Sequence, residues 1–143
     1  EALKVNQLRD ILARQYSKEQ YPVLCYQPEM FAQDQPEELV RSVKAYIDAH
    51  YQQPELTLQD IAEHTHLSAN YVSTLFKKYS GLNIVEYLTQ TRIEQAARLL
   101  TFTNMKTYEI AEQVGYTNSQ YFSVLFKRRY GLSPKEYRGM QAL

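Results

Sequence analysis

The chain has 143 residues, of which 44% are hydrophobic and 22% are charged, a composition typical of a soluble globular protein. It has no apolar run of about 18 residues, which excludes a membrane-spanning helix. Its single cysteine, Cys25, excludes an internal disulfide and fits a reducing compartment, so we expect a cytoplasmic protein. Because the chain begins with Glu1 rather than Met, we expect it to be part of a longer protein.

The charged residues are distributed unevenly along the chain. Overall, 16 Lys and Arg balance 16 Asp and Glu, which is unusual for a nucleic-acid-binding protein. However, residues 1–67 carry six basic and eleven acidic side chains, a net charge of −5, whereas residues 68–143 carry ten and five, a net charge of +5. This polarisation favours a positive face in the second part of the chain.

The first predicted element is a short amphipathic helix over residues 2–16, where leucine, isoleucine and tyrosine recur at helical spacing. Residues 17–36 hold three of the five prolines and predict an irregular linker. We therefore place a domain boundary at this linker. Residues 1–36 are expected to be the end of an upstream sensor or dimerisation segment, and residues 37–143 a second domain.

From residue 37 onward, helical periodicity continues with no strand pattern, which predicts an all-α fold. One apolar stripe predicts a helix that ends before Pro54. Thr57 and Asp60 then have the spacing of a capping box, in which each side chain bonds the other residue's backbone N–H. This pair predicts the start of a short helix over residues 58–64.

A second helix is predicted over residues 69–79, after a tight turn and with Ser68 as its N-cap. Asn83 and Glu86 then have the spacing that opens a longer helix over residues 84–100. Its apolar residues form two stripes, and a helix that is apolar on two sides is expected to pack between two bodies.

The sequence repeats itself with an offset of about 50 residues. The segment 71–82 returns as 121–132, and the second copy has one extra residue just before the repeated helix. The second half should therefore repeat the plan of the first. We expect a short helix capped by Thr107, a helix over residues 119–130 and a final helix after Ser133, which gives about seven helices beyond the linker.

Each copy has the layout of a helix-turn-helix, in which a short helix supports a second helix whose exposed face fits the major groove of B-DNA. The long helix would join the two helix-turn-helix subdomains. Four positions of each second helix are expected to face inward: Val72, Leu75, Phe76 and Tyr79, and then Phe122, Leu125, Phe126 and Tyr130.

The outward side chains are of types that contact DNA. Amides pair with adenine, while hydroxyls and small apolar groups contact base edges or the thymine methyl. The candidate base-contacting residues are Ala69, Asn70, Ser73, Thr74, Asn118, Ser119, Gln120, Ser123 and Val124. Basic and hydroxyl side chains near helix ends suit phosphate oxygens. The candidate phosphate-contacting residues are Ser68, Lys77, Lys78, Arg92, Thr117, Lys127, Arg128 and Arg129. For Arg92, a structural hydrogen-bonding role is an equal alternative.

The predicted long helix has a suitable length for a partner that repeats along its axis. At 1.5 Å per residue, its 17 residues span about 25 Å. Successive major grooves on one face of the duplex lie roughly 34 Å apart. We therefore expect both repeated helices to enter adjacent grooves of double-stranded DNA.

The segment from Val114 to Arg138, with Tyr121-Phe-Ser-Val-Leu-Phe-Lys127 at its centre, resembles the signature of the AraC/XylS family of bacterial transcription regulators. The first copy matches through Tyr71-Val-Ser-Thr-Leu-Phe-Lys77. The resemblance covers about residues 38–139. It implies a seven-helix DNA-binding domain that acts near promoters, commonly as an activator that contacts RNA polymerase, with dimerisation through an upstream region. The residues from Tyr87 to Ile93 are similar to members fused to response-regulator receivers.

Two departures from the family pattern affect base recognition. Many members carry an arginine, which can contact guanine, where this chain has Thr74 and Val124. We therefore expect fewer direct hydrogen bonds to bases.

Several residues have alternatives to a role in DNA binding. Tyr71 and Tyr121 are expected to pack rather than to stack on bases. His64 and His66 lack the further ligands of a metal site and are expected to be turn residues. No motif of an enzyme active site occurs, and we expect no catalytic activity, metal or cofactor. The remaining alternative is a helical adaptor that binds other proteins without contacting DNA.

Overall fold

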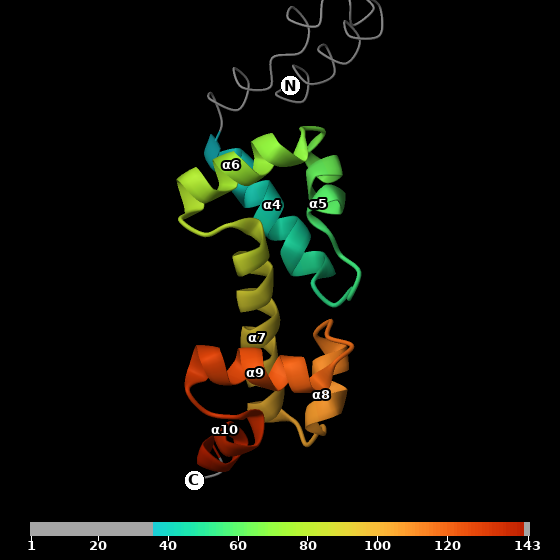
Figure 1. Cartoon of the computed structure of the whole chain (residues 1–143), viewed down its shortest axis with the longest axis vertical. Coiled ribbons are helices and arrows are strands. Elements are labelled where there is room, and N and C mark those ends of the chain that lie inside the picture. Colours follow the sequence, from blue (N-terminus) through green and yellow to red (C-terminus); the bar gives the residue numbers. More distant parts are fainter. Residues whose placement is uncertain (1–35, 142–143) are drawn as a thin grey trace, which may run out of the picture. The chain divides into compact units, whose positions relative to one another are not determined.

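A computed structural model describes residues 36–141. Within this range the structure has seven helices and no strand, which confirms the all-α prediction (Figure 1). The predicted helix over residues 2–16 and the linker up to residue 35 lie outside the described residues. The helices are α4 (Pro36–His50), α5 (Leu58–Thr65), α6 (Ala69–Ser80), α7 (Ile84–Phe102), α8 (Thr107–Gln113), α9 (Ser119–Tyr130) and α10 (Pro134–Gln141).

Reciprocal hydrogen bonds start α5 and α7 at the predicted positions. At α5, the Asp60 N–H donates to Thr57 Oγ1 (3.1 Å) and the Thr57 N–H donates to Asp60 Oδ2 (3.0 Å). At α7, Asn83 and Glu86 exchange the same two bonds, at 2.7 and 2.8 Å. Loss of such a cap typically costs about 1 kcal/mol. Because each pair lies within one turn, these starts are encoded locally.

The cap predicted at Thr107 is wrong. Thr107 is the first residue of α8, and Lys106 occupies the N-cap position. The Lys106 N–H donates to Glu109 Oε1 (2.8 Å), whereas the Lys106 side chain has no acceptor atom with which to cap the helix. One half of a capping box is therefore sufficient to start this helix.

Two hydrophobic cores form around the two ends of α7, where the other helices gather in two groups (Figure 1). Ile84 and Leu88 belong to a core that they share with α4, α5 and α6. Ile93 and Leu100 belong to a second core with α8 and α9. A helix packed between two bodies is confirmed, but the division is between its two ends and not between two lateral stripes. Each half of α7 is thus an integral part of one helix-turn-helix subdomain.

The repeated helices face their cores in the predicted way, with one exception. Val72, Leu75 and Phe76 on α6 are buried, as are Phe122, Leu125 and Phe126 on α9. Burying one such side chain stabilises the fold by about 1.5–3 kcal/mol. Tyr79, however, is 45% exposed, so its assignment to the inward face is wrong. Its equivalent, Tyr130, packs against the second core, with its ring centroid 4.8 Å from that of Phe126 and 5.2 Å from that of Tyr137.

Arg138 on α10 holds the C-terminal end of α7, a role that the sequence does not suggest. Its guanidinium donates to the carbonyls of Leu100 (3.0 Å), Thr103 (3.0 Å) and Met105 (2.7 Å). These carbonyls lie in the last turn of α7 and the loop after it, where no helical partner remains. Among the described residues, no helix combines the length and apolar character that crossing a membrane requires.

Candidate nucleic-acid interface

The first helix-turn-helix consists of α5, a tight turn and α6. His66 adopts the left-handed conformation (φ 64°), and its N–H donates to the Glu63 carbonyl, which ends α5. The Ser68 hydroxyl oxygen accepts from the Tyr71 N–H (3.2 Å) and starts α6. His66 is therefore a turn residue, as predicted, whereas His64 lies in α5 with its ring centroid 4.5 Å from that of Tyr46.

The outward side of α6 carries the predicted contact residues. Asn70, Thr74, Lys77 and Lys78 are exposed, and Ala69 and Ser73 are half-buried beside them. The two lysines lie in the last turn of the helix. This side of α6 can therefore present a short polar strip that is followed by positive charge.

The second helix-turn-helix consists of α8, the turn through Gly115 and α9. Asn118 is the N-cap of α9, since its Oδ1 accepts from the N–H groups of Gln120 (2.9 Å) and Tyr121 (3.0 Å). Only the Asn118 amide NH₂ is left to contact a base. Gln120 and Thr117 are exposed, Val124 is 55% exposed, and Ser119 and Ser123 are half-buried.

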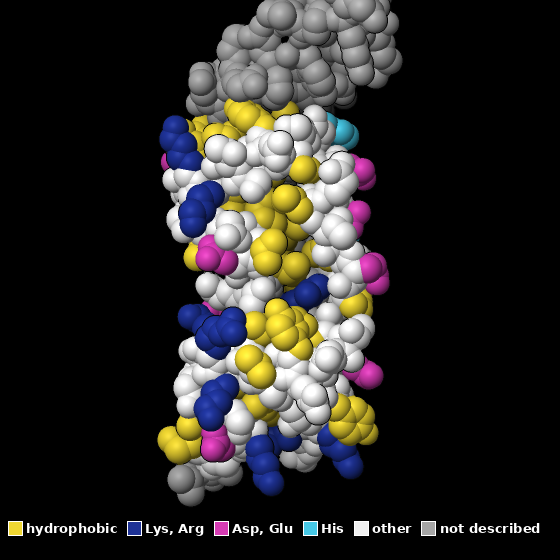
Figure 2. Space-filling view, in the orientation of Figure 1, with side chains coloured by type: hydrophobic (Ala, Val, Ile, Leu, Met, Phe, Trp, Pro, Cys, Tyr) yellow, Lys and Arg dark blue, Asp and Glu magenta, His cyan; other side chains and the backbone are white. Residues whose placement is uncertain are grey.

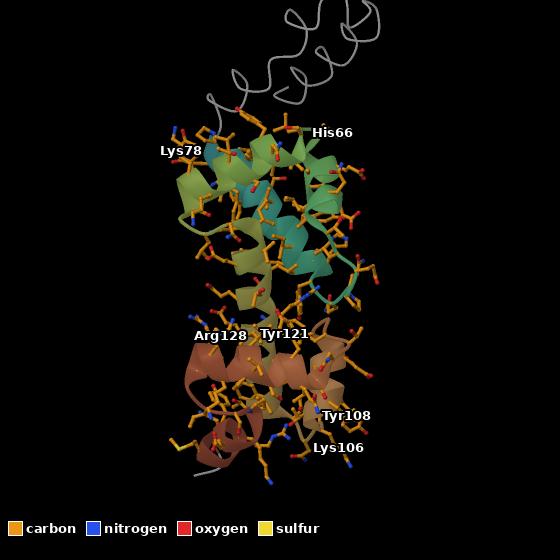
Figure 3. The ribbon with its side chains drawn as sticks, viewed as in Figure 1. His66, Lys78, Lys106, Tyr108, Tyr121 and Arg128 are labelled. Carbon is orange, nitrogen blue, oxygen red and sulfur yellow. The ribbon has the colours of Figure 1, made fainter. Side chains whose placement is uncertain are left out.

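Basic side chains lie at the same end of both repeated helices. Lys127, Arg128 and Arg129 occupy the last turn of α9, as Lys77 and Lys78 occupy that of α6. Figure 2 shows Lys and Arg side chains along the left edge of the view, and Figure 3, in the same orientation, labels Lys78 and Arg128 on that side. Arg129 is partly engaged, because its Nη2 lies 2.7 Å from Glu94 Oε2 on α7. No local pattern in the sequence indicates this ion pair, since its partners are 35 residues apart.

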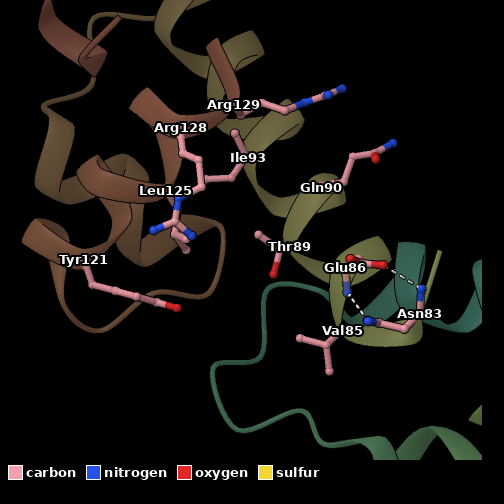
Figure 4. A pocket seen from close by; sticks show the side chains of 10 residues that line it. All are labelled: Asn83, Val85, Glu86, Thr89, Gln90, Ile93, Tyr121, Leu125, Arg128 and Arg129. Atoms are coloured by element: carbon pink, nitrogen blue, oxygen red, sulfur yellow. Dashed lines mark hydrogen bonds between the residues drawn. The ribbon is translucent and has the colours of Figure 1, made fainter. Parts of the chain in front are cut away.

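A hollow of about 530 Å³ lies between α7 and α9 (Figure 4). Its lining includes Val85, Thr89 and Gln90 from α7 and Tyr121, Leu125 and Arg128 from α9. Val85 is 62% and Tyr121 55% exposed, so both present apolar surface. Tyr121 is thus more exposed than a packing residue is expected to be. The combination of apolar groups, hydroxyl and amide groups and a cation suits a sugar–phosphate chain.

The assignment of Arg92 to the phosphate contacts needs correction. Its side chain is buried, with 8% of the residue exposed. Its Nε donates to the Tyr51 carbonyl (2.8 Å) and its Nη2 to the Gln53 carbonyl (2.7 Å). The structure therefore supports the structural alternative for this arginine. Its partners are backbone carbonyls in the loop after α4. The side chains of that loop do not indicate such a contact.

Tyr116, the tyrosine beside Arg92, has a shifted pKa. Burial raises the pKa of Tyr116 above its ordinary value, and the nearby positive charge of Arg92 partly opposes this rise. Tyr116 is therefore a neutral phenol at any physiological pH. Within residues 36–141, no group of three His, Cys, Asp or Glu side chains is placed to bind a metal ion.

Known proteins share both this fold and much of its sequence. A family model described as a helix-turn-helix domain matches residues 61–140, more than half of the chain. The C-terminal domain of AraT, a response regulator from Geobacillus stearothermophilus, is 41% identical with a TM-score of 0.69, over 71% of this chain and 84% of that domain. The chain belongs to the AraC-type helix-turn-helix family.

A further relative and a further solved structure resemble this AraC-type chain. The uncharacterised transcriptional regulator YijO of Escherichia coli K12 is 38% identical over 100 residues, which is 70% of this chain but only 35% of YijO. The DNA-binding domain of AdpA, solved in complex with a target DNA, has a TM-score of 0.67 at 24% identity, over 71% of this chain and 90% of that domain. The AdpA likeness shows a shared fold alone.

Proposed function

We propose that this chain is the DNA-binding part of a transcription regulator and that it inserts α6 and α9 into successive major grooves. The observation that carries the proposal is the matched pair of helix-turn-helix units. Each presents exposed polar side chains on its second helix and exposed basic side chains at that helix's end. The AdpA domain, which shares the fold, was solved bound to its target DNA.

The length of α7 suits this arrangement. Its 19 residues span about 28 Å at 1.5 Å per residue. The separation of the two units packed on its ends is therefore close to the distance of roughly 34 Å between successive major grooves on one face of B-DNA. A modest bend of the duplex would close the remaining difference.

Base recognition is assigned to the exposed side chains of α6 and α9. Asn70 and Gln120 can each pair with adenine through two hydrogen bonds, and Val124 can contact a thymine methyl. Neither helix has an arginine at the outward position that Thr74 occupies on α6 and Val124 occupies on α9. We therefore expect part of the specificity to come from DNA shape and deformability.

We assign the DNA strand that runs between the two major grooves to the hollow between α7 and α9. On one face of B-DNA, a minor groove bordered by phosphates separates successive major grooves. This strand must pass α7 when both helices are inserted. Arg128 would then contact a phosphate, while Tyr121 and Val85 would pack against deoxyribose.

The rest of the regulator would supply regulation. Because AraT is a response regulator, a receiver upstream of this chain would control dimerisation and thereby occupancy of DNA. Activation through contact with RNA polymerase is our working model for the output.

Selection from a random pool of duplex DNA tests the proposal. The expected result is an enriched motif with two parts, centred about one helical turn apart, whose affinity falls steeply with salt. The rival function is a helical protein-binding adaptor. Enrichment of no sequence, together with sedimentation that DNA does not change, would favour the adaptor and overturn DNA binding.

A further inference from the structure

The two helix-turn-helix units are connected by more than the continuous backbone of α7. Arg92, near the middle of α7, donates two hydrogen bonds to the loop after α4, at the carbonyls of Tyr51 (2.8 Å) and Gln53 (2.7 Å). These acceptors are 41 and 39 residues away in sequence. One planar guanidinium thus fixes the position of a first-unit loop on the linking helix.

The same guanidinium also contacts the second unit. Its Cζ lies 5.2 Å from the centroid of the Tyr116 ring, in the range of a cation–π contact. Next to it, Gly115 approaches so closely that a Cβ would lie 2.6 Å from the Tyr51 carbonyl oxygen and 2.8 Å from Arg92 Nε. The turn before α9 therefore lies directly against the loop after α4.

The Tyr51 side chain completes this contact. It packs against the core of the first unit and also against the core of the second. These contacts therefore join residues of both units and of the helix between them. We call them the Arg92 cluster: Tyr51, Gln53, Arg92, Gly115 and Tyr116.

We infer that Arg92 is a positioning residue that holds the two helix-turn-helix units at one relative angle. Helices are rarely straight and curve gently, so α7 alone would leave the separation and orientation of the two recognition helices less well defined. The Arg92 fork bonds two carbonyls in fixed directions, which a lysine cannot do. The inference deepens the proposed function: the Arg92 cluster sets the spacing of the two half-sites that the chain accepts.

The angle can be measured without DNA. Spin labels at Glu63 and Glu112, equivalent exposed positions of the two units, are attached through cysteines in a Cys25→Ser chain. We expect one narrow distance distribution in the parent chain and a clearly broader one in Arg92→Lys. Arg98→Lys is the matched control, because Arg98 is an exposed arginine of the same helix, and it should keep the narrow distribution.

A second variant covers the case in which Arg92→Lys does not fold. Tyr116→Leu removes the ring beside the guanidinium but keeps an apolar side chain, and it should broaden the distribution in the same direction. Circular dichroism establishes that each variant is helical. Equal widths in the parent and in a folded Arg92 or Tyr116 variant would overturn the inference, whatever the chain binds.

The DNA arm tests spacing. The duplex recovered by selection is compared with duplexes one base pair shorter or longer between the half-sites, and with a half-site alone. Because rigid coupling raises the effective concentration of the second unit, Arg92→Lys should lose about tenfold affinity at the native spacing. It should lose little on the half-site, and its preference for the native spacing should be flatter. An equal loss on every duplex would overturn the role in spacing. Failure of the parent chain to bind any duplex would instead refute the proposed function, while the label distances would still test the angle.

Discussion

The Arg129 guanidinium on α9 lies 2.7 Å from the Glu94 carboxylate on α7, so one of the three basic residues at the end of α9 is already paired. Both side chains remain partly exposed, at 47% and 42%. A pair this exposed contributes about 0–1 kcal/mol to folding. Its larger effect is to reduce the positive charge that α9 offers to a phosphate.

Glu94→Gln should therefore increase DNA affinity. Freeing Arg129 adds one phosphate contact, which would raise the affinity a few-fold at low salt and steepen the slope of log K against log salt by about 0.9. Fluorescence anisotropy over a salt series measures both quantities. Glu112→Gln, an exposed acidic residue on α8, is the control for the general loss of negative charge. Equal slopes in the two variants would refute the role of this pair.

Asn70→Ala and Gln120→Ala should lower specificity rather than affinity for DNA in general. Loss of a two-point contact with adenine should cost about 1–3 kcal/mol on the selected duplex and little on a scrambled one. Lys127→Ala provides the contrast, because loss of a phosphate contact should weaken both duplexes alike and reduce the salt slope by about 1. Equal losses on both duplexes from the Asn70 and Gln120 changes would show that these amides do not contact bases.

Features encoded by neighbouring residues could be predicted from the sequence. The capping pair Asn83 and Glu86 lies within one turn, and both bonds are present in the structure. The buried residues of α6 and α9 follow from helical spacing, because one face of each helix must meet the core. The all-α architecture follows from the sum of such local signals.

Contacts between distant segments could not be predicted in this way. The sequence left two roles open for Arg92 because its partners are backbone carbonyls, which every residue carries. One prediction from the repeat does not hold in the packing. Tyr79 and Tyr130 are both expected to face inward, yet only Tyr130 packs on its core, beside Tyr137. In the first unit, Tyr87 is the equivalent of Tyr137 and packs its ring against Phe76, 5.9 Å between centroids, as Tyr137 packs against Phe126 at 5.3 Å. The two copies therefore agree in this contact and differ at Tyr79.

Val85→Glu should weaken DNA binding if the DNA strand between the two major grooves passes the hollow between α7 and α9. Val85 is 62% exposed, so the fold should tolerate either glutamate or glutamine there. A carboxylate would face a phosphate, and we expect affinity for the two-part duplex to fall by about tenfold at low salt, with the loss shrinking as salt rises. Val85→Gln, of the same size but neutral, should retain most of the affinity. Similar binding by the two variants would place the strand elsewhere.

The cap of α10 should make stability depend on pH. The Ser133 N–H donates to Glu136 Oε1 (2.8 Å), and this bond lowers the pKa of Glu136 below its ordinary value of 4.5. A lowered folded-state pKa stabilises the fold fully above the unfolded value, and this contribution is lost as the pH falls from about 4.5 through the folded value. Glu136→Gln can still accept the bond but carries no charge. We expect the wild-type chain to melt at a higher temperature than this variant at neutral pH, and the difference to vanish in acid. Because other carboxylates titrate equally in both chains, the difference between the two melting curves isolates Glu136, and a gap that stayed constant down to acidic pH would contradict the charge-dependent cap.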